Sequence, residues 1–348
     1  QDAVEFVADN YGFKLSYTNT GQNEDFKKYQ SKMNLIIDYF KETMESKVSK
    51  KAVDYLNSRG FDSTDIKKYN VSFIDSDVEK FQKYCKKNEI NNQDLKRLGF
   101  MSSNGNFLFK NRILFPILNI RTETIAFGGR ALDDFGPKYL NSSESLLYKK
   151  NKNLYFTTDF ISSIKKRGYV FLVEGYFDVL ALNKLGYSNV ASPSGTALTT
   201  QQLDVLSRYT KKILLCFDND EAGLAATERI LELRNQIGSK LEINCLNLPQ
   251  NYKDLSELFE NDPKSFKKIL KDNYELVEFL IDKSLTVNND KQRIFEYFQK
   301  LSQHLSPLEV DVSLDLLSKK INTSKDVLKR ELNFQSKNQV DNEKLSRQ

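Results

Sequence analysis

The chain has 348 residues, 39% of them hydrophobic and 28% charged, and its 52 Lys and Arg against 47 Asp and Glu give a formal net charge of +5. This length predicts two or three domains, and the apolar fraction suffices for buried cores, so wholesale disorder is not expected. No window approaches the roughly 18 apolar residues of a membrane-spanning helix, and no secretory signal is visible. Because the chain begins with Gln1 rather than Met, we expect a processed or excised piece of a longer chain.

The first 100 residues are predicted to be mainly helical. Between Phe26 and Tyr55, apolar side chains recur every three or four residues, which is typical of one face of an amphipathic helix. The period changes at Phe107, where the segment FKNRILFPILNIRTETIAFGGRAL is rich in Ile, Leu and Phe and is interrupted by a proline and a Gly-Gly pair. This pattern predicts short strands.

From Tyr169 onward, apolar runs alternate with helical stretches. The runs are YVFLVE, NVAS, KKILLCFD and KLEINCLNL, and the helical stretches lie near residues 177–185, 199–208 and 221–236. Strands that alternate with helices are typical of a parallel α/β sheet. After Asp254 the chain is expected to be helical to about residue 335, and the polar tail beyond it is expected to be a linker or disordered.

The fold class expected from this order of elements is α/β, or α+β overall. We predict four parts along the chain: a basic α+β subdomain at 1–166, an α/β domain at 167–262, a helical subdomain at 263–335 and a tail at 336–348. Residues 105–170 hold eleven Lys and Arg but only five Asp and Glu, a net +6, while the remainder sums to −1. Such a block is typical either of a polyanion-binding region or of a solvated basic face.

Acidic residues follow three of the predicted strands near their C-terminal ends. They are Glu174 in VEGYFDVL, Asp218 and Asp220 in CFDNDEAG, and Asp254 in YKDLSEL. Ligands of open α/β sheets collect at this edge, and carboxylates that converge there can bind Mg²⁺ together with substrate phosphates. Singly, each motif could equally be a turn or a helix cap, so the hypothesis of a metal site for phosphoryl or nucleotidyl chemistry depends on their joint occurrence.

Three other features narrow the chemistry. The one histidine, His304, lies in a helical stretch, so His-based triads and zinc enzymes are poor candidates. The three cysteines are far apart, so neither a zinc ribbon nor a disulfide framework is expected in this segment. The loop SPSGTALT, with Gly195 and Thr196, could contact a phosphate before a helix or simply be a capped turn.

The spacing of Glu174, Asp218 and Asp220 in a βα pattern resembles the Toprim domain, which primases, topoisomerases and some nucleases share. Longer segments are similar to the RNA-polymerase core of bacterial DNA primases of the DnaG type. These segments are VEGYFDVLAL, ASPSGTALTTQQ, LCFDNDEAGLAA, FPI…IAFGGR, PKYLNSSES and DYLNSRGF. The resemblance extends over about residues 1–335.

The resemblance implies a role for each acid. Glu174 matches a metal-associated acid or base, Asp178 the second acid of an EGYxD motif, and Asp218 and Asp220 the metal-binding D-x-D. Asp254 matches the first acid of a D-P-D motif. Catalysis is therefore expected of Glu174, Asp218 and Asp220, and metal binding of these three with Asp254.

The sequence departs from this family after Asp254. KDLSE places Leu255 and Ser256 where many primases have Pro and Asp. Because Ser is a poor ligand for Mg²⁺, the second acid of this motif is missing, and we expect Glu257 or water to substitute.

The resemblance also implies contacts to nucleotides or to the template. The residues are Arg59, Arg112, Arg130, Lys138, Tyr139, Asn141, Lys150, Asp178, Gly195 and Thr196. Basic side chains such as these can clamp a triphosphate, and Tyr139 could stack on a base or simply be packed.

The implied activity is template-directed synthesis of short RNA primers from NTPs, with Mg²⁺ or Mn²⁺ as cofactor and no zinc in this segment. The implied partners are a single-stranded DNA template, NTPs, the nascent RNA primer and a replicative helicase, with no membrane, in the bacterial cytoplasm at the replication fork. The zinc-binding and helicase-binding domains of full-length primases are missing here, so we expect an isolated core. The alternatives are another Toprim enzyme, a nuclease or topoisomerase, and a nucleic-acid-binding module that has lost its chemistry.

Overall fold

The structure is a computed structural model that describes residues 20–134, 136–195, 197–237, 241–287 and 290–333. The predicted tail at 336–348 lies outside these ranges. The chain divides into two compact units, residues 1–119 with 123–149 and residues 120–122 with 150–348. Each unit is described by itself, and the boundary expected at residue 166 stays a prediction.

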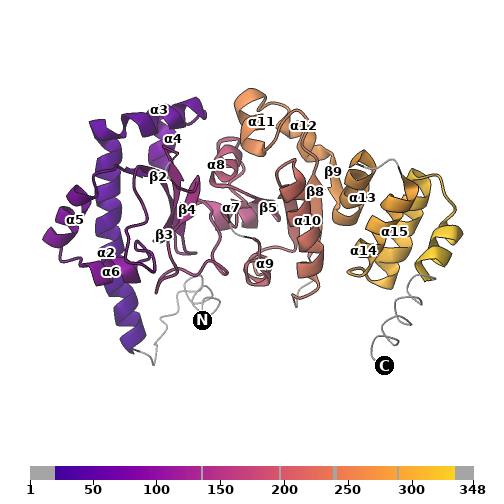
Figure 1. The fold of residues 1–348 in the computed structure, drawn as a ribbon, viewed down its shortest axis with the longest axis horizontal. Coiled ribbons are helices and arrows are strands. Elements are labelled where there is room, and N and C mark those ends of the chain that lie inside the picture. The colour runs from indigo at the N-terminus through magenta and orange to yellow at the C-terminus, as the bar shows by residue number, and fades with distance from the viewer. Residues whose placement is uncertain (1–19, 135, 196, 238–240, 288–289, 334–348) are drawn as a thin grey trace. The chain divides into compact units, whose positions relative to one another are not determined.

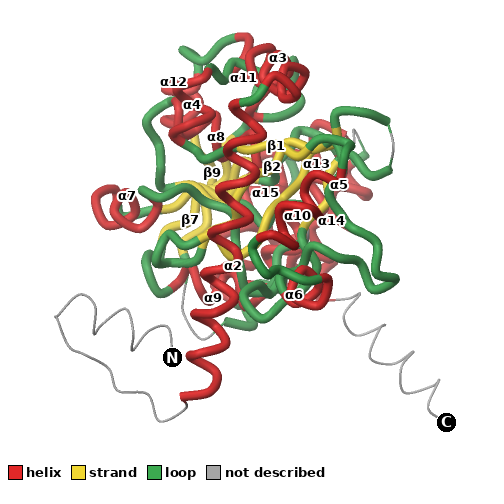
Figure 2. Tube along the Cα trace, turned by 90° about the vertical axis from the view of Figure 1, so that its left-hand side faces the viewer, coloured by secondary structure: helices red, strands yellow, loops and turns green. Residues whose placement is uncertain are grey.

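The first unit contains an antiparallel sheet of four strands in the order β1-β2-β3-β4. The strands are β1 (Ser72–Ile74), β2 (Arg112–Leu118), β3 (Thr124–Ala131) and β4 (Tyr139–Asn141). The helical elements are α2 (Thr20–Glu45), η1 (Lys47–Ser49), α3 (Lys50–Ser58), α4 (Ser63–Lys68), α5 (Val78–Lys87) and α6 (Asn92–Arg97). Figure 1 shows the long α2 running beside the sheet, and Figure 2 shows it crossing β1 and β2.

The apolar stripe predicted from Phe26 to Tyr55 is split between two helices rather than held on one. The α2 helix ends at Glu45, and α3 begins at Lys50 after a 3₁₀ turn. The buried hydroxyl of Ser49 donates to the carbonyl oxygen of Met44 at 2.5 Å, so a side chain replaces the next helical N–H as its partner.

The sheet register places functional candidates on one face. Arg130 of β3 pairs with Tyr139 of β4, and side chains on a strand alternate between the two faces. Phe127 therefore points to the opposite face, where its ring lies 5.5 Å from that of Phe40 in α2. One face of the sheet is thus closed by α2, and Arg130 and Tyr139 belong to the other.

The second unit contains a mixed sheet of five strands in the order β6-β5-β7-β8-β9. The strands are β5 (Val170–Val173), β6 (Val190–Ala191), β7 (Lys212–Cys216), β8 (Glu242–Leu246) and β9 (Asn273–Glu275). Strands β5 to β8 are parallel. All four residues of β5 are buried, as expected for a parallel strand covered on both faces, which explains its uninterrupted apolar sequence.

Helices connect these strands in the predicted alternation, which confirms the α/β fold class. They are α7 (Phe160–Arg167), α8 (Tyr176–Lys184), α9 (Thr200–Ser207), α10 (Glu221–Arg234), α11 (Leu255–Asn261) and α12 (Phe266–Lys271). The expectation that the chain stays helical after Asp254 is wrong at β9. This strand pairs antiparallel with β8 and satisfies backbone groups at its edge.

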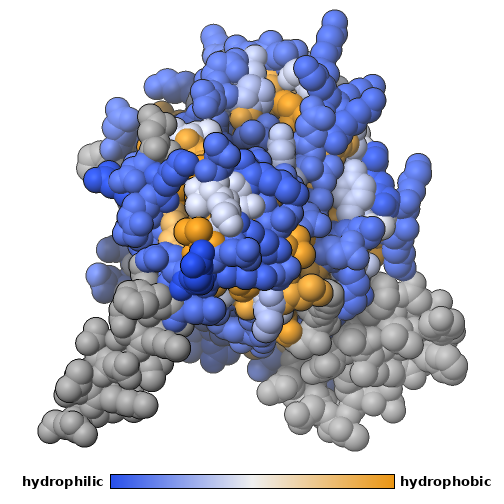
Figure 3. Space-filling view, turned by 90° about the vertical axis from the view of Figure 1, so that its right-hand side faces the viewer, coloured by the Kyte–Doolittle hydropathy of each residue, from blue (hydrophilic) through white to orange (hydrophobic). Residues whose placement is uncertain are grey.

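Among the helices that follow β9 are α13 (Leu276–Val287), α14 (Lys291–Ser302) and α15 (Pro307–Lys320). Ile281, Phe298 and Leu317 join them in one buried cluster. Figure 3 shows a face of the molecule on which hydrophilic side chains predominate, with smaller hydrophobic areas between them. None of the helices in the described ranges is long and apolar enough to cross a membrane.

Candidate active site

The predicted acids lie where the strand order of the second sheet reverses. From β5 the chain moves to β6 on one side and then to β7 on the other, so the switch point lies between β5 and β7. Glu174 directly follows β5, and Asp218 and Asp220 follow β7. The crevice at such a switch point is the usual ligand site of an open α/β sheet.

Glu174 and Asp218 are joined by a hydrogen bond across this switch point. The backbone N–H of Asp218 donates to Oε1 of Glu174 at 2.9 Å. The backbone of Glu174 is held in turn by the buried Ser192, whose hydroxyl donates to its carbonyl oxygen at 2.5 Å. The sequence did not single out Ser192, and only its place after the neighbouring β6 explains this contact.

Asp220 and Asp254 are also helix caps. Oδ1 of Asp220 accepts from the N–H of Gly223 at 3.0 Å in α10, and Oδ1 of Asp254 accepts from the N–H of Glu257 at 2.7 Å in α11. Gly223 is required here because a Cβ at this position would overlap the carbonyl oxygen of Asp218. The side chains predicted to bind a metal are therefore also the side chains that cap these two helices.

Asp178 lies behind the cluster, on α8, and is 7% exposed. It accepts hydrogen bonds from the N–H groups of Gly175 at 3.0 Å and Ser256 at 3.1 Å. The hydroxyl of Ser256 donates to Oδ1 of Asp254 at 3.0 Å. Ser256, the departure from the family pattern, therefore links Asp178 to Asp254 rather than adding a carboxylate.

The electrostatics of the cluster show an excess of negative charge. Burial, followed by repulsion from Glu174, Asp254 and Asp220, raises the pKa of Asp218 to about 7. Burial also raises the pKa of Glu174, and it raises that of Asp178 well above its ordinary value. These shifts are the response expected of carboxylates that are buried and lie close together.

Asp220 is the exception, because its hydrogen bond from the N–H of Gly223 lowers its pKa, with a smaller contribution from Lys253. The ammonium group of Lys253 lies 3.5 Å from Oδ2 of Asp220. Sequence reasoning missed Lys253, although its position directly before Asp254 was a usable signal.

The donor set suits a divalent cation by its chemistry, since hard cations prefer carboxylate oxygens and the site needs positive charge. In the described ranges, however, no three His, Cys, Asp or Glu side chains are grouped closely enough to hold an ion. The caps on Asp220 and Asp254 and the bond to Glu174 each engage one carboxylate oxygen. Ion binding would therefore require these side chains to rotate.

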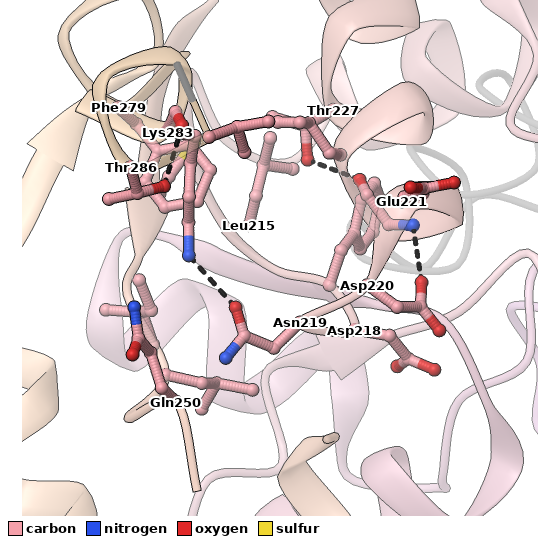
Figure 4. A pocket seen from close by; sticks show the side chains of 17 residues that line it. Leu215, Asp218, Asn219, Asp220, Glu221, Thr227, Gln250, Phe279, Lys283 and Thr286 are labelled. Carbon is pink, nitrogen blue, oxygen red and sulfur yellow. Dashed lines mark hydrogen bonds between the residues drawn. The ribbon is translucent and has the colours of Figure 1, made fainter. Parts of the chain in front are cut away.

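A cavity of about 360 Å³ lies beside the β7–α10 segment, and Asp218, Asn219 and Asp220 line it. Figure 4 shows Lys283 of α13 reaching across this cavity to Asn219. Sequence reasoning missed this contact, for which the 64 residues of separation left no signal.

In the first unit, Arg130 lies against two aromatic rings. Its guanidinium carbon is 5.4 Å from the ring centroid of Tyr55 and 5.3 Å from that of Tyr139. Its Nε donates to the hydroxyl of Tyr55 at 3.2 Å. Tyr139 remains 37% exposed, so this arrangement presents an aromatic ring next to a cation.

Arg112 differs from the other predicted contact residues because it is only 4% exposed. Its Nη1 donates to the carbonyl oxygen of Gly129 at 3.2 Å, and burial lowers its pKa. A direct contact between Arg112 and the template stays a prediction. The burial of this side chain does not favour it.

The remaining predicted contact residues are dispersed. Arg59 caps α3, Lys138 is exposed before β4, and Asn141 ends that strand. Lys150 is half-buried in the second unit, and Gly195 has φ +79° in the loop after β6. Thr196 lies outside the described residues.

Comparison with known proteins gives the family. Residues 39–160 match the family described as the DNA primase catalytic core, N-terminal domain, and residues 171–259 match the Toprim-like family. The DNA primase of Campylobacter jejuni is 33% identical over 330 residues, which cover 91% of this chain and 53% of that protein. The chain belongs to the family of DnaG-type DNA primase catalytic cores.

Solved structures agree with this assignment. A structure of the Aquifex aeolicus primase, with its zinc-binding and RNA polymerase domains, is 29% identical, has a TM-score of 0.72, and is matched over 94% of this chain and 80% of that one. A DnaG primase catalytic domain bound to single-stranded DNA shares the fold at 23% identity and a TM-score of 0.68, over 88% of this chain and 99% of that one. The chain spans about half the length of the curated DNA primases it matches.

Proposed function

We propose that this chain is the catalytic core of a DNA primase, which synthesises short RNA primers from NTPs on a single-stranded DNA template. The observation that carries this proposal is the carboxylate cluster at the switch point between β5 and β7. In a chain of the primase core family, such a cluster is where nucleotidyl transfer would take place.

Glu174, Asp218 and Asp220, with Asp254, are the proposed ligands of Mg²⁺ or Mn²⁺. When bound, the cation supplies charge stabilisation for the attacking and leaving oxygens at the α-phosphate. Burial and, after it, repulsion from Glu174, Asp254 and Asp220 raise the pKa of Asp218, and this repulsion supports the set because a cation would relieve it.

Other groups position the carboxylates, and further side chains are proposed to bind the triphosphate or the template. Asp220 is kept ionised by the Gly223 N–H, and Glu174 is fixed by its bond to the Asp218 backbone. Arg130, Lys138 and Lys150 are proposed to bind the triphosphate or the template backbone, as cations do in phosphoryl-transfer sites. Arg59, Arg112, Tyr139, Asn141, Asp178, Gly195 and Thr196 complete the proposed nucleotide and template contacts.

Single-stranded DNA, NTPs and the nascent RNA primer are the proposed ligands, and a replicative helicase is the proposed partner of the whole protein. The structure of a DnaG catalytic domain with single-stranded DNA supports the template as a ligand. The exposed ring of Tyr139 beside Arg130 supports it further, since aromatic rings and cations together bind single strands.

Replacing the two aspartates that follow β7 tests this function. We expect Asp218→Asn and Asp220→Asn each to reduce primer formation at least 100-fold, because removal of a group that stabilises the transition state costs this much. Binding of single-stranded DNA, measured by fluorescence anisotropy, should change less than twofold.

Primer synthesis at the wild-type rate by both variants would refute the metal assignment. DNA cleavage without NTPs would instead favour a Toprim nuclease or topoisomerase. DNA binding without either reaction, and without metal binding, would favour a module that has lost its chemistry.

A further inference from the structure

Asn219, the residue between the two metal-site aspartates, is held at three points. Its N–H donates to the carbonyl oxygen of Lys253 at 2.6 Å, and its Nδ2 donates to that of Pro249 at 3.5 Å. Its Oδ1 accepts from the ammonium group of Lys283 at 2.9 Å. The first bond fixes the residue before Asp254, and the third reaches the helix α13.

Lys283 has little reason to be a lysine for stability alone. Burial lowers its pKa, and its hydrogen-bond partner in the described part of the chain is the neutral amide of Asn219 rather than a carboxylate. Its ammonium group lies 5.2 Å from the ring centroid of Phe279, and an apolar side chain of similar length could occupy the same place. A half-buried cation without a counter-ion costs desolvation energy, so its hydrogen bond to Asn219 is the feature that remains to be explained.

The cavity under the β7–α10 segment explains why such a bond matters. Asn219 lies beside about 360 Å³ of space rather than against packed side chains, and Figure 4 shows Lys283 reaching into it from α13. Within the described ranges, the side chain of Lys283 is the donor that fixes Oδ1 of Asn219 from this side. Loss of the bond would leave the segment between Asp218 and Asp220 free to shift.

We propose that Lys283 and Asn219 are positioning residues that hold the backbone carrying Asp218, Asp220 and Asp254, so that these side chains can turn onto a divalent cation. Lys283 fixes the side chain of Asn219. Asn219 fixes the backbone between the two aspartates and, through its bond to the carbonyl oxygen of Lys253, the backbone just before Asp254. This inference rests on the proposed metal site and assigns to α13, outside the matched Toprim-like segment, a part in its geometry.

The test measures Mn²⁺ affinity by electron paramagnetic resonance on the full chain, with unfolding temperature measured in parallel. We expect Lys283→Met and Asn219→Ala each to weaken Mn²⁺ binding about 10-fold, the usual effect of losing a residue that orients a metal ligand. The double variant should lose no more than Asn219→Ala alone, because Asn219→Ala already removes the bond to Lys283 together with the bond to Pro249. Lys283→Arg, which keeps a donor, should recover part of the affinity.

Stability separates this role from a purely structural one. Lys283→Met should unfold in metal-free buffer at or above the wild-type temperature, since a buried charge is removed. The matched control is Lys319→Met, which removes an exposed lysine paired with Asp315 at 2.6 Å, and its Mn²⁺ affinity should equal that of the wild type.

The outcomes distinguish the two proposals. Unchanged Mn²⁺ affinity in Lys283→Met and Asn219→Ala, or strictly additive losses in the double variant, would overturn the positioning role alone. Failure of the wild type to bind Mn²⁺, or equal binding by Asp218→Asn, would overturn the metal site and the positioning role together.

Discussion

The same residue type has different tasks in this site, and the surroundings of each aspartate decide which. Asp220 accepts an N–H at the start of α10, which lowers its pKa, whereas burial and three neighbouring carboxylates raise the pKa of Asp218 to about 7. A pair two residues apart therefore contains one acid with a lowered pKa and one with a raised pKa, whose ionised form a nearby cation would favour. This difference lies in the local hydrogen bonds, which the D-x-D spacing alone does not reveal.

Ser256 provides a test at the scale of one hydroxyl group. Ser256→Ala removes the hydrogen bond from the hydroxyl group to Oδ1 of Asp254 but keeps the hydrogen bond from the backbone N–H to Asp178. We expect a loss of about 1 kcal/mol in the free energy of unfolding and Mn²⁺ binding weakened about threefold to tenfold. Calorimetric titration measures the second effect, and an unchanged affinity would show that Ser256 serves the fold alone.

Asp94 gives a prediction of pH dependence away from the site. It is the third residue of α6, where its carboxylate accepts from the backbone N–H of the N-cap residue Asn91 at 3.0 Å and from Lys32 at 2.6 Å. Burial raises its pKa, but the bonds from Lys32 and the Asn91 backbone outweigh burial and leave the pKa below its ordinary value. Its stabilisation is therefore complete above the ordinary value near pH 4 and is lost as the pH falls through the lowered pKa.

We expect Asp94→Asn to lower the free energy of unfolding by about 2 kcal/mol at pH 7, with the difference from the wild type shrinking below about pH 4. Urea unfolding at several pH values measures this. The control, Glu45→Gln, changes an exposed acid 3.7 Å from Lys67 and should alter stability by less than about 0.5 kcal/mol. A pH-independent deficit in Asp94→Asn would mean that the capping geometry matters rather than the charge.

At the scale of elements, the approach of α10 to the end of β7 creates the acid cluster. Gly223 allows this approach, because any side chain there would meet the backbone of Asp218. We expect Gly223→Ala to cost about 1–3 kcal/mol in the free energy of unfolding and to weaken Mn²⁺ binding at the same time. Ala225→Ser, an exposed change in the same helix, should do neither, and a Gly223→Ala variant with native Mn²⁺ affinity would contradict this reading.

The elements of the second unit could be predicted closely because a parallel strand buried on both faces is apolar throughout. The run YVFLVE became β5, with Glu174 directly after it. Three features escaped prediction because they depend on distant partners: β9 exists by pairing with β8, α2 ends where Ser49 binds Met44, and Lys283 meets Asn219 across 64 residues. Periodicity describes a segment's own faces and not which segment will cover them.

At the scale of the whole molecule, the division into two units changes the interpretation of the charge. The basic block at 105–170 spans the division at residue 149. Residues 150–170 alone hold five Lys and Arg against one Asp, so most of the excess belongs to the unit that carries the acid cluster. In the first unit, β2 and β3 contain one cation each, Arg112 and Arg130, and β4 contains none.

We propose above all that this chain joins nucleotides on a template by a metal-dependent reaction. The most direct measurement incubates the chain with single-stranded DNA of defined sequence, labelled NTPs and Mg²⁺ or Mn²⁺, and separates the products by length. We expect alkali-labile products that need the metal, that stop where an omitted NTP would be required, and that Asp218→Asn does not form. Products that form without metal or independently of the template sequence, or no products from a folded chain that binds both DNA and Mn²⁺, would contradict it.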